Sequence, residues 1–545
     1  MIRSTIIFLI TLNFMSCNIK KNTSNISHNY FNDYNNTSTS ANYLTANYSI
    51  KKGDAYTASE ILDKNVQHPK LLELKFFSNL LSGNFESADK VSKKLQINNK
   101  NNDLYKLPEY ILKIKKNDFE GSLNVLKKEN NFLDLDKLND LIKFWIQENG
   151  NKNKFILKKY LKKTSIHELL ILENFHNSKN LLKIADFVYK NSNLNSHDLF
   201  LLAGFYYRAN NINKFEKIIH TKLSDQFDKH FIINNFSSYG NIFNKTPELQ
   251  VILASKIFNI INDVNLEIYN SYTYKKILLE FSIFLNPKMD ISKYSLAEIY
   301  NLEKTNELSF KNLDSISKDS FYFLAANLKK LTILNSFEIK KKYEILLFKI
   351  VKLWPKNKFV LYRLASYYKS KQEYNKSIKI YKKILDHYDS NERDLFLYAS
   401  NLDKVGKWEE AKTLFLDILK KNPKDTYTLN YVSYKLALKE EDLELALNLI
   451  KKALILDPDN GYFLDTLGWV EYKRQNYNSA VYFLEKSVSI LPRSSEVIDH
   501  LGDCYLMLNR KKEAVFEWKK ALKYETDKLM ISKIKEKLNK YEHVL

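Results

Sequence analysis

The sequence predicts an all-α fold, a right-handed α-solenoid of helix hairpins that ends in a capping helix. Three observations predict this fold class. The chain of 545 residues contains only 10 Gly and 8 Pro, whereas average usage would give roughly 38 and 27. Apolar residues recur at helical spacing from about residue 41 to residue 540, and small residues return at a fixed interval near the C-terminus. Strands and their turns need Gly and Pro, so sandwiches and propellers are poor fits.

Residues 1–16 have the organisation of an export signal peptide. Arg3 supplies a positive charge, and residues 6–14 are largely apolar. This stretch is shorter than the roughly 20 residues that a membrane-spanning helix needs. It ends in Ser16-Cys17, which resembles a bacterial lipobox. The resemblance implies that Cys17 is lipidated and becomes the mature N-terminus. An ordinary secretory signal and an uncleaved anchor are the alternatives.

The residue after Cys17 bears on the destination of such a lipoprotein. By the sorting rule for bacterial lipoproteins, Asp at this position favours retention in the inner membrane. Residue 18 is Asn, so the resemblance implies a lipid anchor in the outer membrane and a body that faces the periplasm. Residues 17–40 are rich in Asn, Ser and Thr, which predicts a flexible tether. The only other cysteine is Cys504, so no intramolecular disulfide is expected once Cys17 is acylated.

Residues 356–528 are predicted to form a regular array of helix hairpins. Pro423, Pro458 and Pro492 follow one another at intervals of 35 and 34 residues. Small residues keep the same step at Ala411, Ala446, Ala480 and Ala514. Only small side chains allow two helix backbones to approach closely at a crossing, and a Pro ends the helix before it.

This period, with its Leu-Gly, small and aromatic residues in fixed places, resembles the tetratricopeptide repeat. Residues 495–528 show the pattern well, with Gly502, Tyr505, Ala514 and Trp518 in the expected places. Weaker copies of the pattern predict similar helical repeats over residues 41–200 and degenerate repeats over 201–355, where the register between 220 and 340 stays open. Residues 529–545 continue the helical period and predict the capping helix that repeat arrays need.

Four segments resemble one family more specifically, the tetratricopeptide-repeat outer-membrane lipoproteins of Gram-negative bacteria, best represented in alphaproteobacteria. The segments are residues 43–62, 429–437, 465–492 and 499–522. The resemblance implies an envelope lipoprotein that binds other proteins.

The sequence offers little for catalysis or for cofactor binding. The two closest glycines, Gly461 and Gly468, are seven residues apart, which excludes both the phosphate loop and the dinucleotide fingerprint. No pair of His has the spacing of a helical zinc motif, and no cluster of Cys exists. We therefore expect a protein that is not an enzyme, with no cofactor and no metal.

The net charge of +22 comes almost entirely from Lys, because only seven residues are Arg. Specific phosphate and base recognition depends on Arg. Residues 356–545 account for +7 of the total, so the excess is distributed along the chain. A solvated Lys-rich surface is favoured, a preference for anionic membranes is the alternative, and nucleic acid is not an expected partner.

The tetratricopeptide resemblance also implies a binding surface. In that family, positions two, five, nine and twelve of each first helix line a concave groove, and aromatic residues mixed with single charges suit protein binding there. We call the corresponding residues the groove row: Phe396, Ser400, Tyr431, Lys435, Tyr462, Asp465, Trp469, Tyr472, Asp499, Asp503 and Leu506. Trp469 is the expected anchor. Alternatively, several of these aromatic residues pack against the neighbouring repeat.

Together these observations favour a non-enzymatic scaffold or adaptor lipoprotein that binds protein or peptide clients for an envelope machine. A glycan-binding lipoprotein of nutrient uptake is one alternative, although the chain lacks the Gly and Pro for the long loops such sites use. An envelope hydrolase is another, and it would need catalytic residues within 220–340. Neither the partner nor the oligomeric state follows from the sequence.

Overall fold

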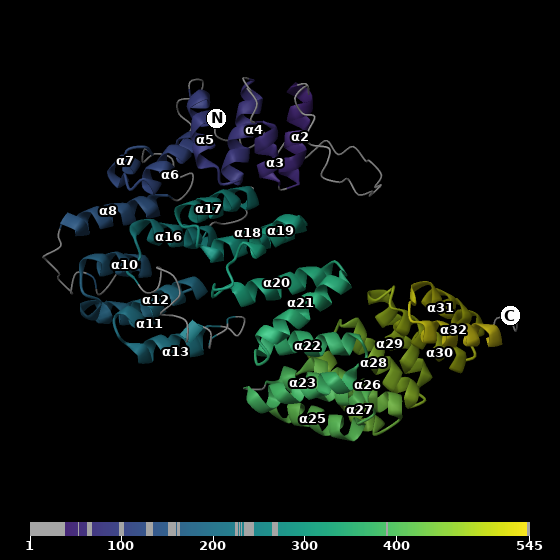
Figure 1. Cartoon of the computed structure of the whole chain (residues 1–545). Helices are drawn as coiled ribbons and strands as arrows, with labels where there is room; N and C mark the ends of the chain where they lie inside the picture. Colours follow the sequence, from purple (N-terminus) through teal and green to yellow (C-terminus); the bar gives the residue numbers. More distant parts are fainter. Residues whose placement is uncertain are drawn as a thin grey trace. The chain divides into compact units, whose positions relative to one another are not determined.

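The computed structural model describes most of the chain after residue 38, which forms two compact units. The described residues are 39–52, 54–62, 68–96, 103–126, 135–150, 160, 164–223, 227, 229, 232–233, 245–263, 271–388 and 391–541. Within them every regular element is a helix, which confirms the predicted all-α fold class (Figure 1). The predicted signal peptide, Cys17 and nearly all of the predicted tether lie outside the described residues.

Unit 1 is the part of the chain up to Leu353. Its helices are drawn from purple to teal and green in Figure 1. They are α2 (Thr39–Lys51), α3 (Ala55–Ile61), α4 (Pro69–Leu81), α5 (Phe85–Gln96), α6 (Leu107–Lys115), α7 (Phe119–Leu123), α8 (Asp136–Gly150), α10 (Ile166–Phe175), α11 (Leu182–Asn191), α12 (Ser196–Arg208), α13 (Ile212–Lys222), α16 (Leu249–Asp263), α17 (Ser271–Leu285), α18 (Asp290–Leu302), α19 (Asn306–Asp314), α20 (Phe323–Ser336) and α21 (Lys340–Leu353), with 3₁₀ turns η3 (Asp103–Lys106) and η4 (Ser178–Leu181).

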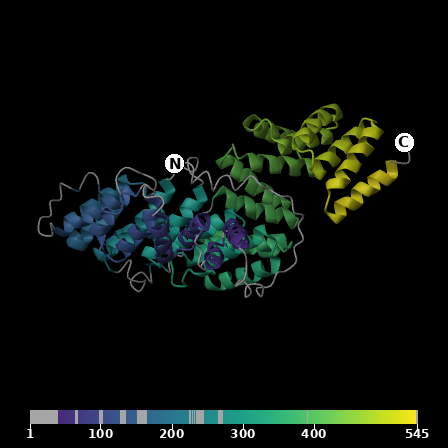
Figure 2. The same ribbon diagram turned by 90° about the horizontal axis from the view of Figure 1, so that it is seen from above.

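Unit 2 runs from Trp354 to Leu545 and consists of five helix hairpins followed by one further helix. Figure 2 gives a second view of its helices, in green to yellow. The hairpins are α22 (Lys358–Ser370) with α23 (Tyr374–His387), α24 (Glu392–Lys404) with α25 (Trp408–Lys421), α26 (Thr426–Lys439) with α27 (Leu443–Leu456), α28 (Gly461–Lys473) with α29 (Tyr477–Ile490), and α30 (Ser495–Met507) with α31 (Lys511–Tyr524). The last helix is α32 (Lys528–Tyr541).

Every hairpin of unit 2 turns through a residue with positive φ just after its first helix. These residues are Gln372, Gly406, Glu440, Gln475 and Asn509, and the α26–α27 turn has a second such residue, Asp442. The first five follow one another at intervals of 34 or 35 residues, so the repeat period is visible in the backbone as well as in the side chains. The same conformation occurs in unit 1 at Lys304 and at Glu338. Lys304 precedes Glu338 by 34 residues, and Glu338 precedes Gln372 by the same interval. The backbone thus gives a repeat register for the end of the stretch where the sequence left it open.

The two helices of a hairpin cross at the small residues. An added Cβ at Gly502 on α30 would lie 2.5 Å from the Trp518 indole nitrogen, and one at Gly468 on α28 would lie 2.6 Å from Leu484 Cγ. Ala480 and Ala514 on the partner helices are completely buried. The small residues therefore set how closely the helices approach, and the large side chains beside them fill the core.

Cys504 belongs to the core of the last hairpin. Its side chain is fully buried on α30 beside the core of α31, and burial raises the pKa of the thiol. Ile534 and Leu538 of α32 join the same core, so α32 covers the end of the array. Within the described part of the chain, no helix combines the length and the apolar character needed to cross a bilayer.

Unit 1 contains contacts between helices that are far apart in the sequence. Helices α16 and α17 pack against helices of the first hundred and eighty residues, α16 against α8 and α10 and α17 against α4 and α6. Figure 1 shows α16 and α17 beside these earlier helices. Lys115 at the end of α6 donates hydrogen bonds to the carbonyls of Phe284 and Leu285, which terminate α17. This part of the chain is therefore more than a stack of sequence neighbours.

Aromatic side chains and one carboxyl group form the contact between α17 and the first hairpins. Phe85 on α5 meets the rings of Phe281 and Phe284 at centroid distances of 6.2 and 5.0 Å. Glu280 lies so close to the α4–α5 turn that a Cβ on Gly83 would be 2.8 Å from its carboxylate. Desolvation at this contact raises the pKa of Glu280 to about 8.

The substitution Gly502→Ala tests the constraint at the helix crossing. The Trp518 ring is fully buried and cannot swing away, so we expect overpacking to lower the stability of the last hairpin by about 1–3 kcal/mol. Thermal unfolding followed by circular dichroism measures the change. Gly150→Ala is the control, because nothing lies within 4 Å of the added Cβ, and its midpoint is expected to change little. Equal midpoints for the two variants would contradict the role of the crossing.

Candidate protein-binding surface

The groove row lies on the first helices of four successive hairpins, α24, α26, α28 and α30. These first helices are close neighbours. The Tyr434 hydroxyl on α26 donates a hydrogen bond of 2.7 Å to Glu496 on α30, so it reaches past one complete hairpin. Seven of the eleven members of the groove row contact a side chain of a neighbouring first helix or of α32.

Trp469, the expected anchor, stacks with two other rings. Tyr472 stacks on it with a centroid distance of 4.7 Å and an angle of 6° between the planes. His500 from the next hairpin stacks on it as well, at 4.1 Å and 19°. Only 8% of Trp469 is exposed, and its indole N–H has no hydrogen-bond partner within the described structure. Trp469 therefore joins α28 to α30, and little of its surface is accessible to a ligand.

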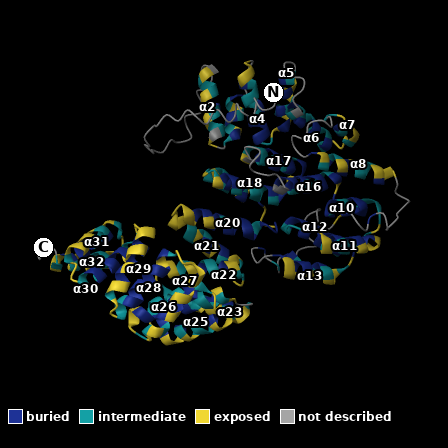
Figure 3. Cartoon of the chain, turned by 180° about the vertical axis from the view of Figure 1, so that it is seen from behind, coloured by how far each residue is buried: buried dark blue, intermediate teal, exposed yellow. Residues whose placement is uncertain are grey.

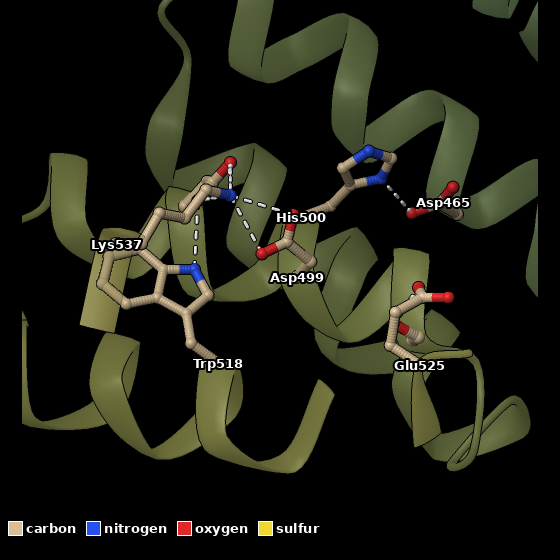
Figure 4. A network of polar contacts seen from close by, with 8 residues as sticks. Asp465, Asp499, His500, Trp518, Glu525 and Lys537 are labelled. Carbon is tan, nitrogen blue, oxygen red and sulfur yellow. Dashed lines mark hydrogen bonds and ion pairs between the residues drawn. The ribbon is translucent and has the colours of Figure 1, made fainter. Parts of the chain in front are cut away.

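A buried ion pair reinforces the same junction. His500 Nδ1 lies 2.9 Å from the Asp465 carboxylate, and both side chains are buried (Figure 4). Burial alone would lower the pKa of His500. The negative charges of Asp465, Glu496 and Asp499 more than compensate, so the pKa of His500 is raised above its usual value.

Two further acidic members of the groove row bind the last helix of the chain. Lys537 on α32 lies 2.9 Å from the Asp499 carboxylate and 2.6 Å from that of Asp503. The indole N–H of Trp518 also donates to Asp503, at 3.0 Å. Burial and the charge of Asp499 raise the pKa of Asp503. Figure 4 shows Lys537, Asp499 and Trp518 converging at this point, where α32 covers the end of the groove row.

At the other end of the groove row, Asp403 joins two hairpins. Its carboxylate accepts a hydrogen bond from the Tyr431 hydroxyl at 2.8 Å and pairs with Lys435 at 2.9 Å. Burial and this hydrogen bond raise the pKa of Tyr431. Phe396 packs edge-on against Tyr431 at 5.5 Å. Ser400 is buried and donates to the backbone of its own helix.

Only one member of the groove row is exposed, Tyr462 on α28, with 59% of its surface accessible. The half-buried members are Phe396, Tyr431, Lys435, Tyr472, Asp503 and Leu506. Burial raises the pKa of Tyr472 to about 12, and the ammonium group of Lys473 lies 5.9 Å from the centre of its ring. Tyr462 is therefore the most accessible point of the predicted surface.

The sequence pattern missed apolar residues at the junctions between hairpins. Tyr427 and Ile455 are each 78% exposed, and Leu456 and Ile490 are exposed as well. An added Cβ on Gly461, the neighbour of Tyr462, would touch Ile490, so Ile490 borders the exposed part of α28. The sequence signal that could have found them is an apolar residue at the end of the second helix of a hairpin. In α25 the equivalent positions are occupied by the charged residues Lys420 and Lys421.

The described residues contain no group of three or more His, Cys, Asp or Glu side chains placed to hold a metal ion. The polar side chains of the groove row are used for pairing between hairpins.

The His500–Asp465 pair should make the stability of the array depend on pH. Because the pKa of His500 is higher in the folded than in the unfolded state, the pair stabilises the array fully at pH values below the unfolded pKa near 6.5. This stabilisation is lost as the pH rises through the pKa of the folded state. His500→Gln removes the charge, and the lost stacking and pairing should cost about 1–2 kcal/mol at about pH 6. We expect the difference in thermal midpoint between the two proteins to shrink as the pH rises to about 9. Lys420→Gln, at an exposed pair, is the control and should show no such trend. A constant difference for His500→Gln would refute the charged pair.

Comparison with known proteins identifies the repeat type. Residues 359–391 match the family model of the tetratricopeptide repeat. A TPR repeat-containing protein of Methanocaldococcus jannaschii is 29% identical over 154 residues, which is 28% of this chain and 26% of the relative. A TPR repeat-containing protein of Pseudomonas aeruginosa is 31% identical over 86 residues, 16% of this chain and 14% of the relative. The chain thus spans about a quarter or less of the length of these relatives.

Solved structures with similar folds include yeast Tom70, with 13% identity, coverage of 92% of this chain and 95% of that one, and a TM-score of 0.33. A thermophilic TPR protein of Thermus thermophilus has 18% identity over 33% of this chain and 95% of its own, with a TM-score of 0.29. Scores this low add nothing to the assignment. Residues 359–391 thus match a tetratricopeptide repeat, the repeat type for which both relatives are named, and such repeats indicate a scaffold for protein interactions.

Proposed function

We propose that this protein is an adaptor lipoprotein of the bacterial envelope that does not act as an enzyme. In this proposal Cys17 is lipidated and anchors the protein in the outer membrane, with its helical body in the periplasm. The C-terminal array binds protein or peptide clients and presents them to an envelope machine such as a protease, an assembly complex or a cell-wall hydrolase.

The binding role is supported chiefly by the contacts that hold the groove row in place. Contacts between successive first helices fix the row before any client arrives: Asp403 with Lys435, Asp465 with His500, and Trp469 with His500. A surface that is rigid in advance loses less conformational entropy when it binds. Tyr462 projects from this support with more than half of its surface accessible, and exposed Tyr is among the residues that dominate protein interfaces.

The apolar junction residues extend this surface beyond the predicted row. Ile490 lies close to Gly461, the residue before Tyr462, so we expect an apolar side chain of a client to contact both Ile490 and Tyr462. Tyr472 adds a half-buried ring on the same helix as Tyr462. The proposed client contact is therefore centred on α28, with Trp469 as support for Tyr472 instead of the anchor itself.

The envelope location is supported by the sequence of the first 18 residues, in which a short apolar stretch is followed by Ser16-Cys17 and Asn18. The specific resemblance of residues 465–492 and 499–522 to lipoproteins of Gram-negative bacteria agrees with it. The partner remains to be identified by the experiment below.

A photo-crosslinking amino acid placed at position 462 should capture clients in intact cells. Tyr462 is exposed on α28, so we expect discrete adducts that mass spectrometry can identify. The control places the same amino acid at Tyr482 on α29, which is exposed to a similar degree but lies on a second helix. Adducts at 462 should decrease about tenfold or more when Tyr472→Ala is added, since a hot-spot residue contributes about 2 kcal/mol or more. Identical adducts from positions 462 and 482 would rule out this surface.

Cys17→Ser tests the lipid anchor separately. We expect the unchanged protein to fractionate with the outer membrane and to carry diacylglycerol on an N-terminal Cys17, as measured by mass spectrometry of its first peptide. Cys17→Ser should abolish acylation and shift most of the protein out of that fraction, because acyl chains supply the membrane affinity. An unmodified Cys17 in mature protein would disprove the anchor and leave the crosslinking result unaffected.

A further inference from the structure

The positive charge of unit 2 is concentrated in its first hairpin. Residues 356–388 contain nine Lys and Arg but only two Asp and Glu, a net charge of +7. Residues 389–545 contain 26 of each sign and have no net charge. The whole excess of this unit therefore lies on α22, α23 and their adjoining turns, and a lysine-rich composition spread evenly over the array does not describe it.

Helix α23 presents this charge on one exposed face. Ser377, Tyr381 and Ile384 form the buried side of the helix. The exposed side carries Lys376, Lys379, Lys382 and Lys383 at helical spacing, with Asp386 as the only acidic residue of the helix. Figure 3 shows the exposed face of this hairpin in yellow. The like charges on this face repel one another, and together they attract a partner of opposite charge.

The lysines of this face lack the partners that other hairpins provide. At α25, the equivalent second helix of the next hairpin, Lys407 pairs with Glu410 and Lys420 pairs with Asp417. On α23 only Lys376 has such a partner, Glu373. Within the described residues, no ion pair involves Lys379, Lys382 or Lys383. Their charge is available to a ligand.

The other helix of this hairpin also combines charge with an exposed apolar side chain. On α22, Phe359 is exposed, and Lys356 lies just before the helix. Lysines around exposed apolar side chains are typical of surfaces that rest on the headgroup layer of a membrane.

We infer that the exposed lysine face of α23 is a docking surface for anionic phospholipid headgroups. Eight of the nine cations in residues 356–388 are Lys, and Lys is a compact point charge without the rigid fork by which Arg recognises individual phosphates or bases. These lysines lie on the outer side of one helix, and they are not arranged to follow a nucleic acid strand and contact its bases. A diffuse anionic surface is the partner that this chemistry fits. The inference does not depend on the Cys17 anchor.

Vesicle binding by the full chain carrying Cys17→Ser tests the inference, because this protein cannot be acylated at that residue. Vesicles of phosphatidylcholine containing about 30% phosphatidylglycerol, which gives them a negative surface potential, are compared with vesicles of phosphatidylcholine alone. The variant Lys379→Gln, Lys382→Gln, Lys383→Gln removes three charges and keeps good helix formers. The matched control, Lys451→Gln, Lys452→Gln, Lys512→Gln, removes three exposed lysines elsewhere in unit 2.

We expect binding to the anionic vesicles that falls about 100-fold in the α23 variant, since each lysine near an anionic surface contributes about a factor of five. The control should lose far less, and high salt should remove the difference. Circular dichroism confirms that both variants are folded. Equal binding by the two variants, or equal binding to both kinds of vesicle, would overturn the inference. So would a short DNA duplex that binds the α23 face when the anionic vesicles do not.

Discussion

The close crossing of two helices within each hairpin is the constraint on which unit 2 depends. At Gly468 and Gly502 a single added carbon would lie within 2.6 Å of a buried side chain. Because the crossing is tight, the large residues beside it, such as Trp518 and Leu484, are held in fixed positions. Fixed positions in one hairpin then allow side chains of successive hairpins to meet at bonding distance. The left-handed residue at each turn, at intervals of 34 or 35 residues, repeats the same geometry along the array.

A consequence is that the charged and aromatic residues of the first helices serve two purposes. Asp403 and Asp465 each bind a lysine or a histidine of the next first helix, and Asp499 binds a lysine of α32. These pairs link neighbouring hairpins and satisfy charges that would be costly to bury alone. The proposed binding surface and the internal cohesion of the array thus involve one row of residues, and substitutions there need a stability measurement beside any binding measurement.

The sequence predicted the helical fold and the repeat period well because both depend on local spacing. Ala480, Ala514 and Gly502 mark the crossings without reference to distant residues. Other features depend on contacts that spacing alone cannot predict. The packing of Phe281 against Phe85 joins residues almost two hundred apart, and the central sequence has lost the pattern that would place them. The repeat pattern located the groove-row positions on each first helix. It did not predict the stacking of His500 on Trp469 or the ion pairs of Lys537 with Asp499 and Asp503, because a repeat pattern does not describe how one hairpin packs against the next.

The buried thiol of Cys504 provides a way to measure how often the last hairpin opens locally. In the closed hairpin the thiol is inaccessible, and its raised pKa keeps it from forming the reactive thiolate. Alkylation of Cys504 can therefore proceed only while α30 and α31 are apart, so its rate at fixed reagent concentration reports how often that separation occurs. The terminal hairpin, which α32 covers, can in this way be observed separately from the melting of the whole chain.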